Sequence, residues 1–326
     1  MNQYDYPDFT GLPVDSDRRE YVISPEDALT VDLAIKIGRP LLIEGEAGCG
    51  KTQLAYAIAN EFSMKPPIIW PVRSSSRAND LFYRFDALSR LQDSYIEANS
   101  EKAKYSSNYI HLEKIGEAIS KGLDRVILID EVDKADMDFQ NDLLFALERF
   151  EFPIDEIPNE EIDIAAKRGL APRMQRTEGK RPIVLLTSNR ERQLPKPFLR
   201  RCIYLELKFP NDPEDLYDIV VANLRRRHDG GEPGGVALHT LNEELIRGAV
   251  ASFLRIRDAA ELDNANKKPA TAELLDWIHA MHIHPDEITR LDTLTPSFWQ
   301  LLFRSSEDML RHQSNSVARR ENDTDD

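Results

Sequence analysis

Eight residues near the start of the chain have the types and spacing of a phosphate-binding loop. They match the pattern G-x-x-x-x-G-K-[ST] and are Gly45, Glu46, Ala47, Gly48, Cys49, Gly50, Lys51 and Thr52. The glycines let backbone N–H groups approach phosphate oxygens closely. Lys51 offers a positive charge to the outer phosphates, and Thr52 offers a hydroxyl to a magnesium ion. We therefore expect this loop to bind the phosphates of a nucleotide together with Mg²⁺.

The segments on both sides of the loop are those that such a site requires. Leu41–Ile43 is an apolar run short enough to be a buried strand, and apolar residues recur at helical spacing from Leu54 to Ala59. A helix that starts near Lys51 points the positive end of its dipole at the bound anion. Strand, loop and helix together distinguish this match from a chance glycine-rich turn.

Two carboxylates end a second apolar strand further along the chain. The run from Arg125 to Ile129 is followed by Asp130 and Glu131. Asp130 can hold the magnesium ion, directly or through water. Glu131 can polarise a water molecule for attack on the terminal phosphate. The alternative is two solvated charges at the start of a loop, but the phosphate loop upstream favours a nucleotide hydrolase.

Asn189 and two arginines complete the set of candidate catalytic residues. Asn189 follows the apolar run from Ile183, where an amide can orient the attacking water or touch the terminal phosphate. Arg200 and Arg201 precede Cys202, and a guanidinium stabilises the extra charge of a phosphoryl-transfer transition state. If such an arginine reaches the nucleotide of a neighbouring subunit, hydrolysis requires a ring. A pair of surface arginines is the alternative.

Short apolar strands alternate with helical patterns over the first two thirds of the chain, which predicts a parallel, doubly wound α/β sheet. Ser24 and Pro25 predict the start of a helix that ends at Gly38. The region 73–122 is too long for a bare connection, so we expect helices at 78–85 and 110–120. Beyond residue 209 the pattern is helical, at 213–227, 241–257, 271–282 and 295–312.

Composition limits the classes of function. The chain has 326 residues, of which 41% are hydrophobic and 30% charged, and this length suggests two domains. The formal net charge of -15 argues against broad nonspecific binding to nucleic acid or anionic membranes. We find no apolar run of membrane-spanning length and no signal peptide at the start. The two cysteines, Cys49 and Cys202, suggest no disulfide framework, so a cytoplasmic location fits best.

These motifs together resemble the MoxR-like branch of the AAA+ ATPases over about residues 21–310. GEAGCGKT is similar to Walker A, VILIDE to Walker B, LLTSN to the sensor-1 strand and LPKPFLRRC to the segment bearing the arginine finger. Residues 130–148 are very like MoxR-type sequences after Walker B. The resemblance implies ATP as the nucleotide, a five-stranded P-loop AAA+ core with a C-terminal all-helical lid domain, and a ring that is usually a hexamer. Within it, Arg201 best fits the finger position, and Arg200 replaces a common acidic residue.

Composition and the resemblance together set the domain boundaries. The polar, mixed residues 1–20 indicate an irregular N-terminal arm, and a shift in composition at Phe209–Pro213 ends a nucleotide-binding domain at 21–209. This domain carries a helix insertion at about 73–122 and a hairpin insertion at about 151–182. A helical lid at 210–314 and a disordered tail at 315–326 follow. The family usually has a sensor-2 arginine early in a lid helix, and here Lys268 stands in the corresponding segment. Lys268 can substitute as a point charge, or the role is lost.

The resemblance implies an ATPase that remodels, matures or activates a partner protein in a chaperone-like way. Its partner would be a von Willebrand factor A domain protein or another protein client. Two other functions stay open at this point. One is a nucleic-acid-associated motor or restriction-type NTPase, and the other is a slow nucleotide-regulated switch or scaffold in a signalling or defence assembly.

Overall fold

The computed structural model describes residues 6–11, 21–96, 99–176, 181–229, 242–263, 265–288 and 291–322. These residues form two compact units. The first is built mainly from Ile23–Gly45 and Lys51–Leu207, and the second mainly from Glu46–Gly50 and the residues after Leu207. The middle of the phosphate loop therefore belongs to the second unit, while Gly45, Lys51 and Thr52 belong to the first.

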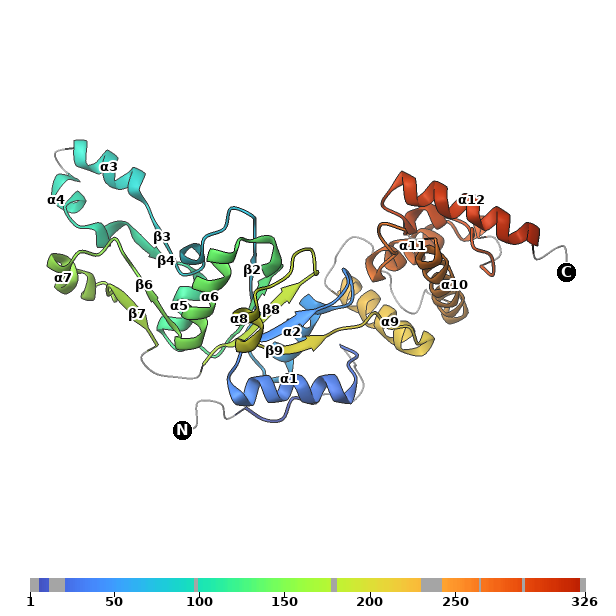
Figure 1. Ribbon diagram of the computed structural model, residues 1–326, viewed down its shortest axis with the longest axis horizontal. Coiled ribbons are helices and arrows are strands. Elements are labelled where there is room, and N and C mark those ends of the chain that lie inside the picture. Colours follow the sequence, from blue (N-terminus) through green and yellow to red (C-terminus); the bar gives the residue numbers. More distant parts are fainter. Residues whose placement is uncertain are drawn as a thin grey trace. The chain divides into compact units, whose positions relative to one another are not determined.

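A five-stranded parallel sheet forms the centre of the first unit (Figure 1). Its order is β2-β5-β8-β1-β9, and every pairing is parallel. The three central strands are almost wholly buried, which explains their continuous runs of Val, Ile and Leu. The fold class expected from the sequence is confirmed. The strands are β1 (Leu41–Glu44), β2 (Ile68–Pro71), β5 (Val126–Asp130), β8 (Ile183–Ser188) and β9 (Ile203–Glu206).

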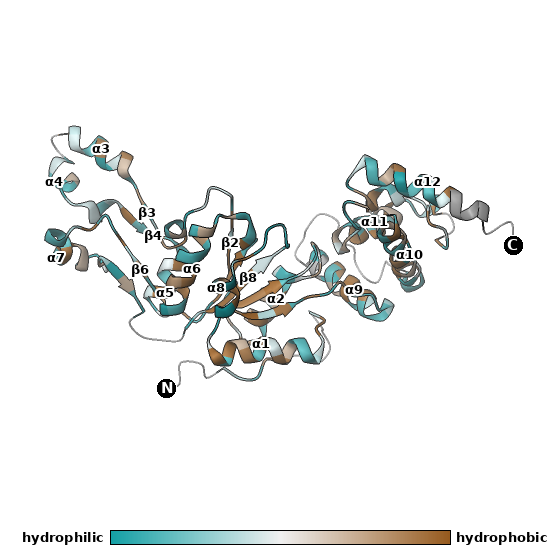
Figure 2. Ribbon diagram, in the orientation of Figure 1, coloured by the Kyte–Doolittle hydropathy of each residue, from teal (hydrophilic) through white to brown (hydrophobic). Residues whose placement is uncertain are grey.

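Helices connect these strands, and Figure 2 shows hydrophilic and hydrophobic residues mixed along them. α1 (Pro25–Ile37) begins where Ser24 caps it by accepting a hydrogen bond from the backbone N–H of Asp27. Such a cap contributes about 1 kcal/mol. α1 ends at Gly38, whose φ of 72° lies in the left-handed region. The connecting helices that follow are α2 (Lys51–Glu61), α6 (Met137–Arg149) and α8 (Lys196–Arg201).

The stretch 73–122 is less helical than the sequence suggests. A 3-10 turn (Ala78–Leu81) and strand β3 (Tyr83–Phe85) replace the helix expected at 78–85. Strand β4 (Ile110–Leu112) precedes α5 (Lys114–Ser120) and pairs antiparallel with β3. Aromatic side chains favour this outcome, because Phe82 is buried in a stack on Phe152 at 4.8 Å between ring centroids. Two helices, α3 (Ala87–Tyr95) and α4 (Ser100–Ala103), lie between the two strands in the chain.

Residues 151–176 form a second antiparallel ribbon. β6 (Glu151–Pro153) pairs with β7 (Arg173–Gln175), and α7 (Ile162–Ala166) lies between them in the chain. In Figure 1, α3, α4 and α7 lie at the ends of the two ribbons, away from the parallel sheet. Both ribbons belong to the first unit.

The second unit is helical in its described part. Its core gathers buried side chains of α9, α10 and α11 around Trp277, which has no exposed surface. The expected last helix at 295–312 is instead a 3-10 turn (Trp299–Leu302) followed by α12. The helices are α9 (Pro213–Asp229), α10 (Glu243–Leu262), α11 (Thr271–Ile283) and α12 (Ser306–Asn322).

The structure corrects the expectation for the C-terminal tail, and it describes only part of the expected N-terminal arm. The tail expected to be disordered from residue 315 is helical as far as Asn322, and Ser316 within it is buried. Of the expected arm at 1–20 only 6–11 is described, and there Tyr6 and Phe9 are buried against the first unit. Residues 1–5, 12–20 and 323–326 lie outside the described residues. No helix in the described part is long and apolar enough to cross a membrane.

Candidate active site

Strand register brings the candidate residues of three strands to one edge of the sheet. Glu44 of β1 pairs with Ser188 of β8, and Ile129 of β5 pairs with Leu186 of β8. The phosphate loop follows Glu44, the carboxylate pair follows Ile129, and Asn189 follows Ser188. Because the strands are parallel, all three groups lie at the carboxyl edge, where ligands bind in open α/β sheets.

The phosphate loop has the backbone shape that its glycines predict. Gly48 and Gly50 have φ values of 81° and 95°, a region that favours glycine. Lys51 begins α2, is only 8% exposed, and its Nζ donates a hydrogen bond to the Gly45 carbonyl at 2.7 Å. The backbone of the loop therefore holds the ammonium group in place before any anion binds.

Thr187 links the two carboxylate residues to strand β8. Its Oγ1 donates to Oδ1 of Asp130 at 2.5 Å and accepts a hydrogen bond from the backbone N–H of Glu131 at 2.8 Å. The Thr187 side chain has no exposed surface. Thr187 was not predicted as a site residue, although a polar residue one position before the end of a buried strand is a feature that could have identified it.

Both oxygens of the Glu131 carboxylate are engaged. Oε1 accepts a hydrogen bond from Nδ2 of Asn189 at 2.8 Å, and Oε2 accepts one from Nζ of Lys134 at 2.5 Å. The hydrogen bond to Glu131 raises the pKa of Lys134 above its ordinary value, although burial opposes the shift. The Glu131 backbone is left-handed, with φ 61° and ψ 51°. Such strain costs about 1–3 kcal/mol and is found at functional sites.

Arg190, the residue after Asn189, joins three strand ends at the carboxyl edge. Its Nε lies 3.0 Å from Oε2 of Glu44, and its NH2 lies 2.9 Å from the Tyr204 hydroxyl and 2.6 Å from Oε1 of Glu206. The Glu206 hydrogen bond, then Tyr204 and Glu44, raise the pKa of Arg190. The Arg190 backbone is also left-handed, with φ 63°. Through these contacts Arg190 connects Glu44, which precedes the phosphate loop, to the segment that carries Asn189. The sequence did not identify Arg190 as a candidate.

Arg200 and Arg201 lie at the other edge of the sheet. α8 ends with them, and β9 begins two residues later at Ile203, which pairs with Leu41, the first residue of β1. Nε of Arg201 lies 3.3 Å from Oε2 of Glu148 on α6, an ion pair with both side chains about half exposed. Within the described residues we find no side-chain partner for Arg200. The structure therefore does not bring the two arginines to the carboxylates and Asn189.

Lys268 contacts the phosphate loop within the second unit. Its Nζ lies 2.9 Å from Glu261 and 3.3 Å from Oε1 of Glu46. Arg257 of α10 pairs with the other Glu46 oxygen, is 6% exposed and stacks over the Phe209 ring at 3.8 Å. Burial alone would raise the pKa of Glu46, but Arg257 and Lys268 hold it below its ordinary value.

The contact of Arg257 with Glu46 in the phosphate loop was not predicted from the sequence. Arg257 lies in the last third of an amphipathic helix, and nothing in the spacing distinguishes it from other helical arginines. Thr271 adds a second contact to the loop, because its Oγ1 donates to the Gly48 carbonyl at 3.1 Å. The arginine–glutamate pair and this hydrogen bond fix the middle of the loop within the second unit.

One protein-family model matches part of the chain. Residues 39–152 match the family model of the AAA domain, Cdc48 subfamily. This match includes the phosphate loop and the Asp130–Glu131 pair. A search of curated proteins finds no match.

Three solved structures show distant similarity. The FIGL-1 AAA domain in complex with ADP is 15% identical with a TM-score of 0.36, and the match covers 76% of this chain and 62% of that one. A RuvB variant from Thermotoga maritima is 15% identical with a TM-score of 0.39, covering 84% and 70%. NtrX from Brucella abortus in complex with ADP is 12% identical with a TM-score of 0.45, covering 89% and 58%. At these values the similarity says nothing of activity or partners.

Proposed function

We propose that this chain, part of which matches an AAA domain model, hydrolyses ATP with Mg²⁺ in a ring of its own copies. We propose further that the hydrolysis cycle remodels or activates a partner protein. The family domain, the edge of the sheet with its carboxylates, and the resemblance to MoxR-like proteins support this proposal. A hexamer is the form that the resemblance suggests. A cytoplasmic location belongs to the same proposal.

The carboxyl edge supplies residues for each part of the reaction. The loop N–H groups and Lys51 would bind the phosphates. Thr52 and Asp130 offer the hard oxygen ligands that Mg²⁺ prefers, and the bound ion would neutralise charge on the phosphates. The described residues contain no group of three or more His, Cys, Asp and Glu that could hold a metal.

Glu131 and Asn189 have the chemistry to direct water. A carboxylate can take a proton from the attacking water, and the amide of Asn189 can orient the water or the terminal phosphate. Their hydrogen bond at 2.8 Å already places the two groups together.

The observation that carries the ring proposal is the place of the two arginines. They are exposed and lie at the amino edge, while the phosphate loop leaves β1 at its carboxyl end. A strand of four residues separates these edges, about 13 Å at 3.3 Å per residue. An arginine at the amino edge is therefore better placed to serve the nucleotide of a second copy than its own.

The Glu148–Arg201 pair does not prevent such a role. Exposed ion pairs contribute about 0–1 kcal/mol, so a phosphate group can displace Glu148 at small cost. Arg200 has no such pairing among the described residues and is the second candidate.

A slow switch is the alternative that one observation favours. Lys134 and Asn189 each donate a hydrogen bond to one oxygen of the Glu131 carboxylate, so an attacking water must compete with them for these oxygens. Turnover would then be low until a partner or a neighbouring copy moves Lys134. A nucleic-acid motor has less support because the net charge is -15.

A protein client fits the surface of α3. None of its residues is buried, and Leu88, Leu91 and Tyr95 are 66%, 54% and 82% exposed. Their spacing places them on one side of the helix, and exposed apolar patches mark interaction sites. A von Willebrand factor A domain protein is the partner class that the resemblance suggests.

ATP hydrolysis per subunit across a dilution series tests this function. We expect turnover that rises with protein concentration and is lost in Glu131→Gln. Concentration-independent turnover would contradict the ring, and turnover retained in Glu131→Gln would contradict the site. No turnover for the isolated chain, with ATP binding intact, would favour the slow switch.

A further inference from the structure

Arg39 makes an unusual set of contacts with the end of α8. Its Nε donates to the carbonyl of Arg201 at 3.2 Å, and its NH2 donates to the carbonyls of Arg200 and, at 3.3 Å, Cys202. Three consecutive carbonyls of one chain segment thus accept from a single guanidinium. The carbonyls at the end of a helix have no partner within the helix, so a side chain that satisfies them fixes where the helix ends.

Arg39 is itself held firmly at its backbone. Its N–H donates to the carbonyl of Ala34 at 3.1 Å, beside the Gly38 N–H that donates to the same carbonyl. This is the hydrogen-bond pattern of a helix that ends at a left-handed glycine. Pro40 then accepts a hydrogen bond from the Ile203 N–H at 2.8 Å. The guanidinium therefore extends from a rigid junction of α1, β1 and β9.

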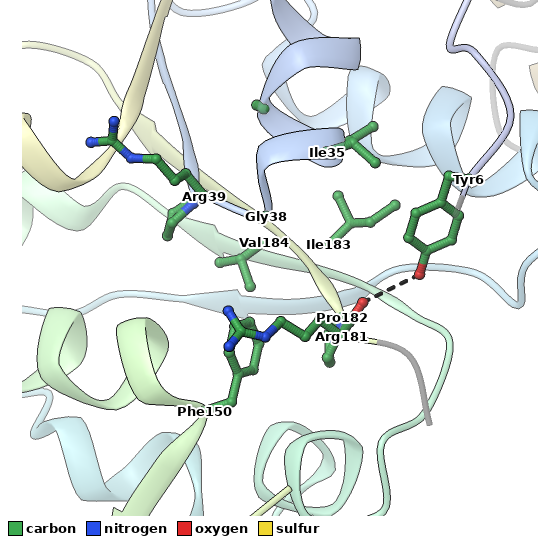
Figure 3. Close-up of a pocket in the computed structure, with 11 residues that line it drawn as sticks. Tyr6, Ile35, Gly38, Arg39, Phe150, Arg181, Pro182, Ile183 and Val184 are labelled. Carbon is green, nitrogen blue, oxygen red and sulfur yellow. Dashed lines mark hydrogen bonds between the residues drawn. The ribbon is translucent and has the colours of Figure 1, made fainter. Parts of the chain in front are cut away.

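The other attachment of α8 is apolar. Phe198 has no exposed surface and packs in the core of the first unit. In Figure 3 the Arg39 side chain extends away from the pocket that Tyr6, Phe150 and Arg181 line. Arg39 therefore contacts α8 on one side and borders that pocket only with its stem.

We propose that Arg39 is a positioning residue that fixes the end of α8 and so presents Arg200 and Arg201 to the nucleotide of an adjacent copy. This inference rests on the proposed function. A six-residue helix has few hydrogen bonds of its own, so its end depends on outside partners. A misplacement of about 1 Å can cost about 100-fold in rate, so a loosened end would impair transition-state stabilisation.

The charge on Arg39 alone does not explain the contact set. A lysine has one compact ammonium group, while the planar fork of arginine reaches several acceptors at once. Arg39→Lys should therefore keep the charge and lose most of the hold on the three carbonyls. We expect its rate to lie between wild type and Arg39→Ala.

The test separates positioning from folding through subunit mixing. We expect Arg39→Ala to bind ATP with an unchanged Kd and to lose about 10- to 100-fold in kcat at saturating ATP. Mixing it with Lys51→Ala, which cannot bind nucleotide but carries an intact α8, should restore turnover. Random mixing places a competent site beside an intact α8 at about one interface in four, so about a quarter of wild-type turnover is the ceiling.

Arg125→Ala is the matched control. Arg125 precedes β5 at the same edge of the sheet and donates to the Pro66 carbonyl at 2.6 Å, and within the described part of the chain we find no hydrogen bond or ion pair from its side chain to α8. It should keep wild-type kcat. A weakened Kd for Arg39→Ala, or no recovery on mixing, would overturn the inference. If Arg39→Ala does not fold, the mixture of Arg39→Lys with Lys51→Ala decides. Recovery of turnover in this mixture supports the positioning role. The role is refuted if Arg39→Lys by itself has wild-type kcat, or if the mixture does not recover turnover.

A parallel mixture separates this inference from the proposed function. The double variant Arg200→Ala, Arg201→Ala should also recover with Lys51→Ala. Recovery of the double variant without recovery of Arg39→Ala would refute only the role of Arg39. Failure of both mixtures would refute the shared site itself.

Discussion

The two edges of the parallel sheet are organised in opposite ways. At the carboxyl edge, the polar groups bind one another: Thr187 contacts Asp130, and Asn189 and Lys134 contact Glu131. At the amino edge, Arg39 holds only backbone carbonyls of α8, and the Arg200 and Arg201 side chains face outward with one weak ion pair. The candidate catalytic groups of the carboxyl edge are therefore tied to one another, while the two arginines of the amino edge are exposed and have one carboxylate partner among the described residues, Glu148. A second copy of the chain is the simplest partner for both.

The largest effect should come from the amino edge. Arg201→Ala should lower kcat by about 1,000-fold, because an arginine supplied to a phosphoryl-transfer site contributes at least this much. ATP affinity should change little. Steady-state ATPase assays and equilibrium binding of a fluorescent ATP analogue measure the two quantities.

Arg200→Ala is the matched comparison on the same helix. A large loss for Arg201→Ala with a small loss for Arg200→Ala assigns the finger to Arg201, and the reverse result assigns it to Arg200. If neither variant, nor the pair together, lowers kcat, then the amino edge takes no part in catalysis.

At the carboxyl edge, Glu131→Gln should lower kcat by about 100-fold or more while ATP binding persists. An amide cannot take the proton of the attacking water, and general-base catalysis contributes about 100- to 10,000-fold. Glu151→Gln, in the β6–β7 ribbon, is a control that should keep wild-type turnover. A Glu131→Gln variant with normal turnover would show that another group activates the water.

Lys134→Met should have a smaller effect and in the opposite direction. Without the ammonium group, Oε2 of Glu131 loses the donor that competes with water, so turnover of the isolated chain should rise about two- to fivefold. The raised pKa of Lys134 keeps its ammonium group charged at pH values below the ordinary lysine value, and this charge is lost as pH rises through the raised pKa. A fall in turnover would mean that Lys134 positions Glu131 rather than holding it idle.

The smallest expected effect is a difference in alkylation between the two cysteines, one at each edge of the sheet. Burial raises the pKa of Cys202, at the amino edge, to about 12, while Cys49 in the phosphate loop is partly exposed. Iodoacetamide at pH 8 should therefore alkylate Cys49 and spare Cys202, and ATP should protect Cys49; mass spectrometry counts the labels. Equal labelling of both thiols would contradict the buried environment of Cys202.

The same pKa shift predicts a direction for stability. An unfolded cysteine ionises near pH 8.5, well below the pKa of buried Cys202. The stabilisation from the buried thiol is therefore complete below about pH 8.5 and declines as pH rises above it. Cys202→Ala should reduce this decline in thermal melts.

The sequence predicted the parts whose chemistry is local. A strand, a glycine loop and a helix follow one another directly around Lys51, and each buried strand is a continuous apolar run. It did not predict Thr187, Arg190 or Arg257, because their roles arise from contacts between segments far apart in the chain. The aromatic residues around Phe82 were misread as helical, because a short apolar stretch fits a strand and a helix equally well until its partner strand is known.

The arginines show the same limit. Their residue type indicated a role in charge stabilisation, but spacing alone could not tell on which edge of the sheet they lie. The register of Ile203 with Leu41 decides this point. The role of Arg39 could not be predicted for the same reason, because an arginine that precedes a strand forms no distinctive sequence pattern.

The most direct test of a site shared between copies is a mixture of two inactive variants. Lys51→Ala lacks the phosphate site, and the double variant Arg200→Ala, Arg201→Ala lacks the guanidinium groups. We expect each variant alone to be inactive and an equimolar mixture to regain up to about a quarter of wild-type turnover, because random mixing pairs an intact phosphate site with intact arginines at one interface in four. A mixture that stays inactive, while each variant is folded and assembled, would contradict a shared site.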